Sequence, residues 1–401
     1  QRTTGGIVMV AKSIAEKMSG SSWIRAMFEK GAMLREKYGA DKVYDFSLGN
    51  PDLEPPIGVK KALIRLAGSE EPDLHKYMNN AGFPDVRAKI SAQIQRETGL
   101  PLSGKHIIMT CGAAGGLNVV LHTILNPGEE VIVLAPYFAE YLGYIENHRG
   151  KVVLSPCSTG SFEPDLSDLE RKITPSTKAL ILNSPNNPTG VVYSSAILGK
   201  MAELIEAKER EFHTQILILS DEPYTRLVYD GCTVPSVLRI FPNSVVVNSY
   251  SKSLALPGER IGYIAAHPFM KNVDSLINGF AYSNRALGFV NAPSMFQKVI
   301  AESLEESVDT DIYRERRDLI YNHLIQLGYT CRKPQGAFYL FPRALIDDDI
   351  AFVEHAAKYN VLLVPGTGFG CPGYFRLSYS VSRKTIENSL PAFEKLTRDF
   401  Q

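Results

Sequence analysis

The chain has 401 residues, of which 44% are hydrophobic and 9% aromatic, and its 43 basic side chains are balanced by 43 acidic ones. This composition is typical of a globular protein with a substantial core, and it excludes a largely disordered chain. Because no long block of one charge occurs, a nucleic-acid or membrane-surface partner is disfavoured and a small-molecule ligand is the better expectation.

The predicted elements begin with a helix from about residue 22 to 38, followed by the turn-rich segment SLGNPD (47–52). Short apolar runs then alternate with longer helical patterns up to about residue 286. The strand-like runs are HIIMT (106–110), EVIVLAP (130–136), KVVLS (151–155), KALIL (178–182), ILILS (216–220), SVVVN (244–248) and RIGYIAAHP (260–268). This alternation predicts an α/β fold with a mostly parallel central sheet covered by helices on both faces.

The pattern changes in the last third of the chain. Two helical stretches (289–306 and 311–328) precede short strands around GAFYLF, VLLVPG and YFRLSYS, and an amphipathic helix (385–400) closes the chain. We interpret this part as a smaller α+β domain. The predicted division is therefore a large ligand-binding domain over 52–286 and a small domain formed by residues 1–51 and 287–401.

The five cysteines are widely spaced, and none lies in a C-x-x-C pair or beside a histidine cluster: Cys111, Cys157, Cys232, Cys331 and Cys371. We therefore predict neither disulfides nor a metal site. The sequence also shows no secretion signal and no apolar segment long enough to span a bilayer. Together these features predict a cytoplasmic protein.

In an open parallel sheet, ligands bind outside the carboxyl ends of the strands, so the residues that follow each run are the candidate site. CGAAGG (111–116) leads into a helix whose N-terminus suits a phosphate, although small residues at a tight turn also have a steric explanation. NSPNNPTG (183–190) concentrates amides behind a strand. Asp221 and Tyr224, in D-E-P-Y, follow ILILS, where a helix cap is the alternative interpretation.

The stretch SYSKSLALPGER (249–260) places one lysine behind an apolar strand. A surface lysine is the default interpretation, but an unpaired ammonium would be costly to bury at this position. An aldehyde that forms an imine with Lys252 removes that cost. The hydroxyls of Ser249 and Ser251 and the guanidinium of Arg260 then have a use in holding a phosphate.

These motifs resemble the pyridoxal-phosphate enzymes of fold type I, and within them the aspartate-aminotransferase-like class I/II aminotransferases. The resemblance rests on S-x-S-K followed eight residues later by arginine, N-N-P-T-G, D-E-P-Y, and F-R-L-S near the C-terminus. All four motifs occur in the order of the family, and the resemblance runs over nearly the whole chain. Each motif alone is weak to moderate, whereas their joint occurrence is a strong signal.

The resemblance implies roles for particular residues. Lys252 would form the internal aldimine with pyridoxal 5'-phosphate, Asp221 would pair with the pyridine nitrogen, and Tyr224 and Asn187 would bind the phenolic oxygen. Phe138 would stack on the ring. The implied phosphate cup consists of Gly112, Ala113, Ala114, Ser249, Ser251 and Arg260, in which Ala114 stands where relatives often have a hydroxyl residue.

For the substrate, the resemblance implies that Arg376 binds the α-carboxylate through a two-point contact, with Gly49, Asn50 and Asn187 beside it. Tyr77 matches a tyrosine that reaches the cofactor phosphate of a neighbouring subunit, which implies a homodimer. Specificity for the amino-acid side chain stays open between aspartate, aromatic and aliphatic substrates. Arg285 is only a weak candidate for contacting a second carboxylate.

The implied activity is transfer of an amino group from an L-amino acid to a 2-oxo acid by a ping-pong mechanism, with Lys252 as general base and Asp221 and Tyr224 in support. Two alternatives remain. A lyase, decarboxylase or racemase would use the same lysine and aspartate. A non-catalytic ligand-binding protein could also be built on this scaffold.

Overall fold

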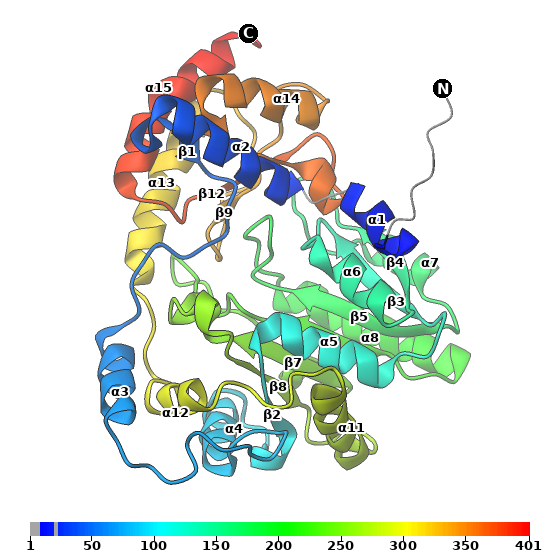
Figure 1. Cartoon of the computed structure of the whole chain (residues 1–401). Helices are drawn as coiled ribbons and strands as arrows, with labels where there is room; N and C mark the ends of the chain where they lie inside the picture. Colours follow the sequence, from blue (N-terminus) through cyan, green and yellow to red (C-terminus); the bar gives the residue numbers. More distant parts are fainter. Residues whose placement is uncertain (1–8, 20–22) are drawn as a thin grey trace.

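A computed structural model describes residues 9–19 and 23–401, and it has two lobes (Figure 1). The lower lobe in Figure 1 surrounds a large sheet, and the upper lobe contains the C-terminal helices together with the N-terminal helix α2 (Trp23–Tyr38). Helix α1 (Lys12–Ser19) lies beside the sheet lobe. Within the described residues, no helix is long and apolar enough to cross a membrane.

The large sheet has seven strands in the order β2-β8-β7-β6-β5-β3-β4. β8 pairs antiparallel with both of its neighbours, and every other pairing is parallel, which confirms the predicted mostly parallel sheet. The strands coincide with the seven predicted runs: β2 (Ile107–Thr110), β3 (Glu130–Ala135), β4 (Lys151–Pro156), β5 (Thr177–Asn183), β6 (Leu217–Asp221), β7 (Ser244–Ser249) and β8 (Gly262–Ala266).

The strands are apolar throughout because both faces of the sheet are covered. In β3, Val131 and Val133 pack on one face, whereas Ile132 and Leu134 pack on the other, as the two-residue period of a strand requires. The first face is covered by α5 (Gly112–Ile124), α6 (Glu140–Asn147) and α11 (Val273–Ala286). The second face is covered by α7 (Leu166–Lys172), α8 (Ser195–Phe212) and α9 (Val237–Ile240), and at its β2 end by α3 (Ile57–Ala67), α4 (Pro84–Thr98) and α12 (Ser294–Glu302).

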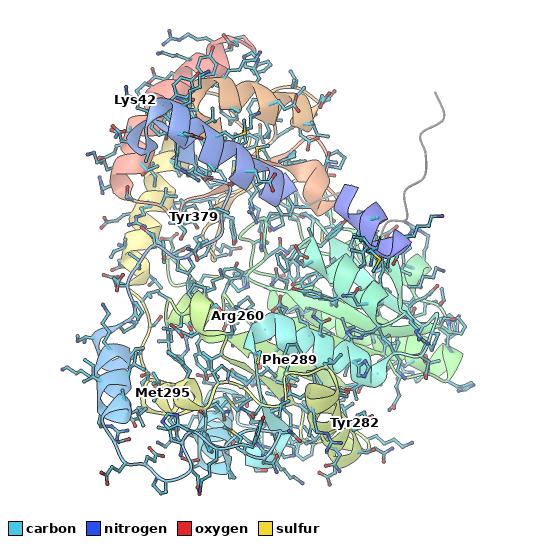
Figure 2. The ribbon with its side chains drawn as sticks, viewed as in Figure 1. Lys42, Arg260, Tyr282, Phe289, Met295 and Tyr379 are labelled. Carbon is cyan, nitrogen blue, oxygen red and sulfur yellow. The ribbon has the colours of Figure 1, made fainter. Side chains whose placement is uncertain are left out.

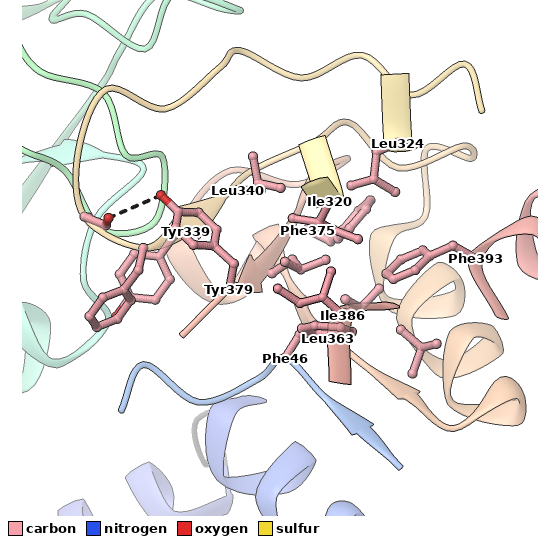
Figure 3. Close-up of a cluster of buried hydrophobic side chains, with 14 of the residues drawn as sticks. Phe46, Ile320, Leu324, Tyr339, Leu340, Leu363, Phe375, Tyr379, Ile386 and Phe393 are labelled. Atoms are coloured by element: carbon pink, nitrogen blue, oxygen red, sulfur yellow. Dashed lines mark hydrogen bonds between the residues drawn. The ribbon is translucent and has the colours of Figure 1, made fainter. Parts of the chain in front are cut away.

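The smaller lobe is built around a three-stranded antiparallel sheet in the order β11-β12-β9 and a parallel pair of β1 with β10. Its core contains Phe46, Ile320, Leu324, Phe375 and Phe393 (Figure 3). The elements are β1 (Tyr44–Asp45), β9 (Tyr339–Leu340), β10 (Val361–Leu362), β11 (Val364–Pro365), β12 (Phe375–Ser378), α13 (Thr310–Gln326), α14 (Asp349–Ala356) and α15 (Arg383–Arg398).

Short helical turns connect these elements: η1 (Ala40–Lys42), η2 (Gly104–His106), α10 (Tyr250–Ser253), η3 (Pro257–Glu259), η4 (Ala357–Tyr359) and η5 (Gly366–Phe369). The division of the chain after residues 51 and 286 stays a prediction. Helix α12, which belongs to the predicted small domain, packs against α3 and α4 and shares their apolar cluster. This contact favours a second boundary later in the chain, between α12 and α13.

Candidate active site

A cavity of about 310 Å³ lies at the carboxyl ends of the central parallel strands, where residues of both lobes meet. Figure 2 shows Arg260 in this region between the lobes. Twelve of the residues predicted for the site line the cavity: Gly49, Ala113, Ala114, Phe138, Asn187, Asp221, Tyr224, Ser249, Ser251, Lys252, Arg260 and Arg376. The remaining lining residues are Leu117, Tyr141, Asn183, Pro223, Pro257 and Tyr339.

The sheet topology explains why residues far apart in sequence meet here. β6 ends at Asp221, and its neighbours β5 and β7 end at Asn183 and Ser249. In the ladder, Asn183 and Asp221 lie opposite each other. Because parallel strands place their carboxyl ends along one edge, the segments that follow them, including the short helix α10 with Lys252, open onto one cavity.

Asp221 is a buried carboxylate with one satisfied oxygen. The hydroxyl of Tyr141 donates a hydrogen bond of 2.5 Å to Oδ2, whereas Oδ1 has no hydrogen-bond partner among the described residues. Burial raises the pKa of Asp221 to about 6, against the opposing effect of the Tyr141 hydrogen bond. A cationic N–H donor in the cavity would satisfy Oδ1 and favour the ionised carboxylate.

Lys252 carries the amine of the site. Its Nζ donates a hydrogen bond of 2.6 Å to the carbonyl of Gly49 and lies 5.4 Å from the centre of the Phe338 ring. Burial, reinforced by the positive charges of Arg376 and Arg260, lowers the pKa of Lys252 to about 8. At pH 7 roughly a tenth of this amine is therefore uncharged, far more than for an exposed lysine, and the uncharged form is the one that a nucleophile or a general base requires.

Arg376 brings a buried guanidinium from β12 of the smaller lobe. Its Nη1 donates to Oδ1 of Asn187 at 3.1 Å, and its Nη2 donates to the carbonyl of Ser47 at 2.6 Å. The guanidinium lies between the rings of Tyr339 and Phe369, at 4.7 and 4.8 Å from their centres. No carboxylate of the described chain pairs with it, and Nε has no partner there, so the group is suited to an incoming anion.

An anion cradle forms at the start of α5. Its N-cap residue, Cys111, makes no side-chain cap, so the first N–H groups of the helix are available to a ligand. Gly112 has a φ of +71°, and a Cβ at this position would lie 2.8 Å from Nη2 of Arg260. The glycine therefore allows the guanidinium to approach the helix N-terminus, beside the buried Ser249 and Ser251.

These features fit pyridoxal phosphate. The cradle suits its phosphate, and the unpaired Oδ1 of Asp221 suits its pyridine N–H. The uncharged fraction of Lys252 suits its aldehyde. Phe138 lines the same cavity and packs its ring edge-on against Tyr141, at 5.5 Å between centres, so an aromatic surface is available to a flat ring.

Three residues predicted for the site lie outside the cavity lining: Gly112, Asn50 and Tyr77. Gly112 packs against the guanidinium of Arg260, which itself lines the cavity. Tyr77 is 90% exposed and is not among the residues that line the cavity. The weak candidate Arg285 also lies outside the lining: it is on α11, over the ring of Tyr282 at 5.6 Å, and Figure 2 shows Tyr282 well away from Arg260.

Sequence reasoning missed Tyr141 and Tyr339, and it included Asn183 only as part of the candidate segment 183–190, without a role of its own. Tyr141 follows Phe138 by three residues, so the spacing of a helical turn could have placed both on one face. Asn183 is the last residue of β5 and belongs to the set of strand ends. Tyr339 lies in a strand of the other lobe, and no local signal in GAFYLF marks its hydroxyl as part of a cavity.

Known proteins of similar sequence align with most of this chain. The model of the family "Aminotransferase class I and II" matches residues 41–393. An aspartate/prephenate aminotransferase of Thermus thermophilus is 33% identical over 371 residues, which cover 91% of this chain and 93% of that protein. An aspartate aminotransferase of Geobacillus stearothermophilus is 32% identical over 386 residues, with coverage of 91% and 93%.

Solved structures show the same architecture. An aminotransferase of Eubacterium rectale matches with a TM-score of 0.95 and 40% identity, covering 98% of this chain and 100% of that one. The aspartate aminotransferase of Thermus thermophilus with maleate matches with a TM-score of 0.86 and 31% identity, covering 97% and 100%.

Proposed function

Because the chain belongs to the class I and II aminotransferases and is a pyridoxal-phosphate-dependent enzyme of that family, we propose that it transfers the amino group of an L-amino acid to a 2-oxo acid at the cavity around Lys252. The reaction would follow a ping-pong course, in which the oxo acid product leaves before the second substrate enters. The observation that carries this proposal is that two groups line one cavity. Asp221 has a buried carboxylate oxygen without a hydrogen-bond partner among the described residues, and Lys252 has a pKa lowered to about 8.

We propose that the cofactor is held by residues of the sheet lobe. Asp221 would accept the pyridine N–H, Tyr224 and Asn187 would bind the phenolic oxygen, and Phe138 would stack on the ring. The phosphate would lie in the cradle formed by Gly112, Ala113, Ala114, Ser249, Ser251 and Arg260. When bound, pyridoxal phosphate supplies an aldehyde for the amine and a ring that withdraws electrons from the substrate Cα.

The substrate would be oriented by Arg376, whose planar guanidinium can hold an α-carboxylate through two parallel hydrogen bonds. Asn187 and Gly49 lie beside it in the cavity. Nζ of Lys252 would take the proton from the substrate Cα, since its lowered pKa leaves the amine partly free near neutral pH. The aromatic walls around Lys252 and Arg376 would exclude water from the transfer.

We further propose a homodimer in which Tyr77 reaches the partner's site, since an exposed tyrosine that does not line its own cavity is available for such a contact. The cytoplasmic location expected from the cysteines stays a prediction. The side-chain specificity also stays open, although relatives named for aspartate, prephenate and aromatic amino acids make acidic and aromatic substrates the first to test.

Reduction of the protein loaded with pyridoxal phosphate tests the assignment of Lys252. Borohydride should abolish the visible absorption band and fix the cofactor covalently to the peptide that contains Lys252. Lys252→Ala should lose this labelling and transamination, whereas Lys200→Ala, a matched change at an exposed position of α8, should retain both. A protein that stays colourless with added cofactor, or labelling on another lysine, would sink the proposal.

Product analysis then separates the reaction types. Incubation with aspartate, phenylalanine or leucine and a 2-oxo acid acceptor should yield a new 2-oxo acid and a new amino acid in equal amounts. Release of ammonia or carbon dioxide, or racemisation without an oxo acid, would instead support the alternative lyase, decarboxylase or racemase activities. No turnover by the coloured protein with any amino acid would support a ligand-binding role.

A further inference from the structure

The hydroxyls of Tyr224 and Tyr339 form a hydrogen bond of 2.9 Å between the two lobes. Tyr224 follows β6 of the large sheet, whereas Tyr339 lies in β9 of the smaller lobe. Both side chains are buried. Figure 3 shows Tyr339 at the edge of the core cluster of the smaller lobe.

The strand pairing fixes the position of this hydroxyl. Tyr339 pairs with Ser378 across the antiparallel ladder, and Arg376 is two residues from Ser378 on the same face of the strand. The guanidinium of Arg376 therefore lies against the Tyr339 ring, at 4.7 Å from its centre. Burial raises the pKa of Tyr339 and keeps its hydroxyl protonated, while the positive charge of Arg376 acts in the opposite direction and polarises the O–H bond for donation.

The backbone of the N-terminal segment leaves room for the same hydroxyl. A Cβ on Gly49 would lie 2.0 Å from Oη of Tyr339, closer than two nonbonded atoms can approach. The space in front of Gly49 is thus filled by the phenol in this structure. The carbonyl of Gly49 accepts the hydrogen bond from Lys252. Tyr339 therefore packs against the same glycine that binds the reactive amine.

A count of protons determines the direction of the Tyr224–Tyr339 hydrogen bond. Each phenol has one proton and can both donate and accept. Under the proposed function, Tyr224 donates its proton to the phenolic oxygen of the cofactor, so its own oxygen can only accept from Tyr339. We propose that Tyr339 is a positioning residue, which donates to Tyr224 and thereby directs the Tyr224 proton toward the cofactor.

Hydrogen bonds in such a chain strengthen one another, because each donor becomes more polarised when its oxygen also accepts. Tyr339 therefore stabilises the negative charge on the phenolic oxygen of the cofactor without touching it. The stabilised anion lowers the pH at which the cofactor bound to Lys252 loses its proton. This inference rests on the proposed function and concerns the tuning of that site by the smaller lobe.

The test is a spectroscopic pH titration of the cofactor-loaded protein, in which the visible absorption of the bound cofactor reports its protonation. Tyr339→Phe removes only the hydroxyl and should raise the midpoint by about 0.3–1 pH unit. Tyr224→Phe should raise it further. Because Tyr339 acts through Tyr224, adding Tyr339→Phe to Tyr224→Phe should produce no additional shift.

Tyr379→Phe is the matched control. Tyr379 is buried in the same cluster and donates to the carbonyl of Ala337 at 3.2 Å, outside the cavity (Figure 3). This variant should titrate as the unmodified protein does, whereas a general loss of packing would shift both variants alike. A Tyr339→Phe midpoint equal to that of the unmodified protein, or an equal shift with and without Tyr224, would overturn the inference.

The titration of the unmodified protein separates the two proposals. A normal colour change in the unmodified protein, unaltered by Tyr339→Phe, refutes the role of Tyr339 and leaves the proposed function intact. If the unmodified protein develops no absorption band with pyridoxal phosphate, the proposed function fails, and the role of Tyr339 fails with it.

Discussion

The hydroxyl of Tyr141 donates its hydrogen bond to one oxygen of Asp221, a residue that lines the cavity, and the other oxygen has no partner among the described residues. Tyr141 lies in the first turn of α6 and packs against Phe138, which precedes the helix, so this short segment positions both a ring and a hydrogen-bond donor for the site. The tyrosine counteracts part of the cost of burying the carboxylate. It therefore controls the fraction of Asp221 that is ionised near neutral pH.

Tyr141→Phe should raise the pKa of Asp221 above about 6, because burial then acts without the opposing hydrogen bond. Loss of a hydrogen bond to a charged group corresponds to a decrease in turnover of about ten- to a hundredfold. The acidic limb of the profile of kcat against pH should shift to higher pH. Tyr144→Phe, on the same helix but without a hydrogen bond to Asp221, is the control and should leave the limb in place.

Asp221→Asn should separate stability from activity. The pKa of Asp221 is raised in the folded state to about 6 from 3.8, so the folded form binds more protons between these values. The stabilising contribution of this group is complete below pH 3.8 and is lost as the pH rises through 6. In the cofactor-free protein, the amide should therefore increase the free energy of unfolding by about 1–3 kcal/mol at pH 8 and by little at pH 4.

Urea unfolding of the cofactor-free variant and unmodified protein at the two pH values measures this difference. Turnover of the cofactor-loaded Asp221→Asn variant should fall by about a hundredfold or more, since the neutral amide cannot hold the pyridine nitrogen protonated. An equal stability difference at pH 4 and pH 8 would show that the burial of charge is not its cause.

Arg376→Lys should weaken substrate binding while the cofactor remains bound. An ammonium cannot reproduce two parallel hydrogen bonds, so KM for an amino acid should rise by about ten- to a hundredfold. The absorption of the bound cofactor should be nearly unchanged. A primary amine without a carboxylate is the control substrate, and an equal loss of its conversion would contradict the assigned contact.

Gly49→Ala should destabilise the protein by about 1–3 kcal/mol, because the added methyl group meets the hydroxyl of Tyr339. Thermal or urea unfolding measures the change. Adding Tyr339→Phe should recover part of the loss, since the nearest remaining ring carbon would be 3.0 Å away. Gly199→Ala, on α8, is the control, because an added Cβ there would have no described atom outside its own helix backbone within 4 Å, and it should stabilise the helix by about 0.5–1 kcal/mol.

The sheet could be predicted from sequence because its strands are short, apolar and followed at once by polar residues. Asp221, Lys252 and Ser249 were correctly placed near one another by the rule that parallel strands end at one edge. The antiparallel direction of β8 could not be read from its residues, since an apolar run has the same pattern in either direction.

The contacts between the lobes could not be predicted in the same way. The hydrogen bond of Tyr339 to Tyr224 depends on how two separately packed cores are placed, and no local periodicity encodes that placement. Tyr141 was missed for a simpler reason. It lies on the buried face of α6, so its sequence position is explained by packing alone, and nothing local indicates that its hydroxyl binds Asp221. The position of α12 against α3 and α4 also depends on contacts distant in sequence.

The hydrogen bond of Arg376 to the carbonyl of Ser47 joins residues 329 positions apart. During synthesis from the N-terminus, every residue proposed to hold the cofactor within one subunit leaves the ribosome before Arg376 does. The strands of the large sheet, β2 to β8, are also complete by Ala266. The growing chain can therefore form the cofactor-binding residues first and the substrate-binding contact of Arg376 afterwards. This is the same order in which the finished enzyme binds cofactor and substrate.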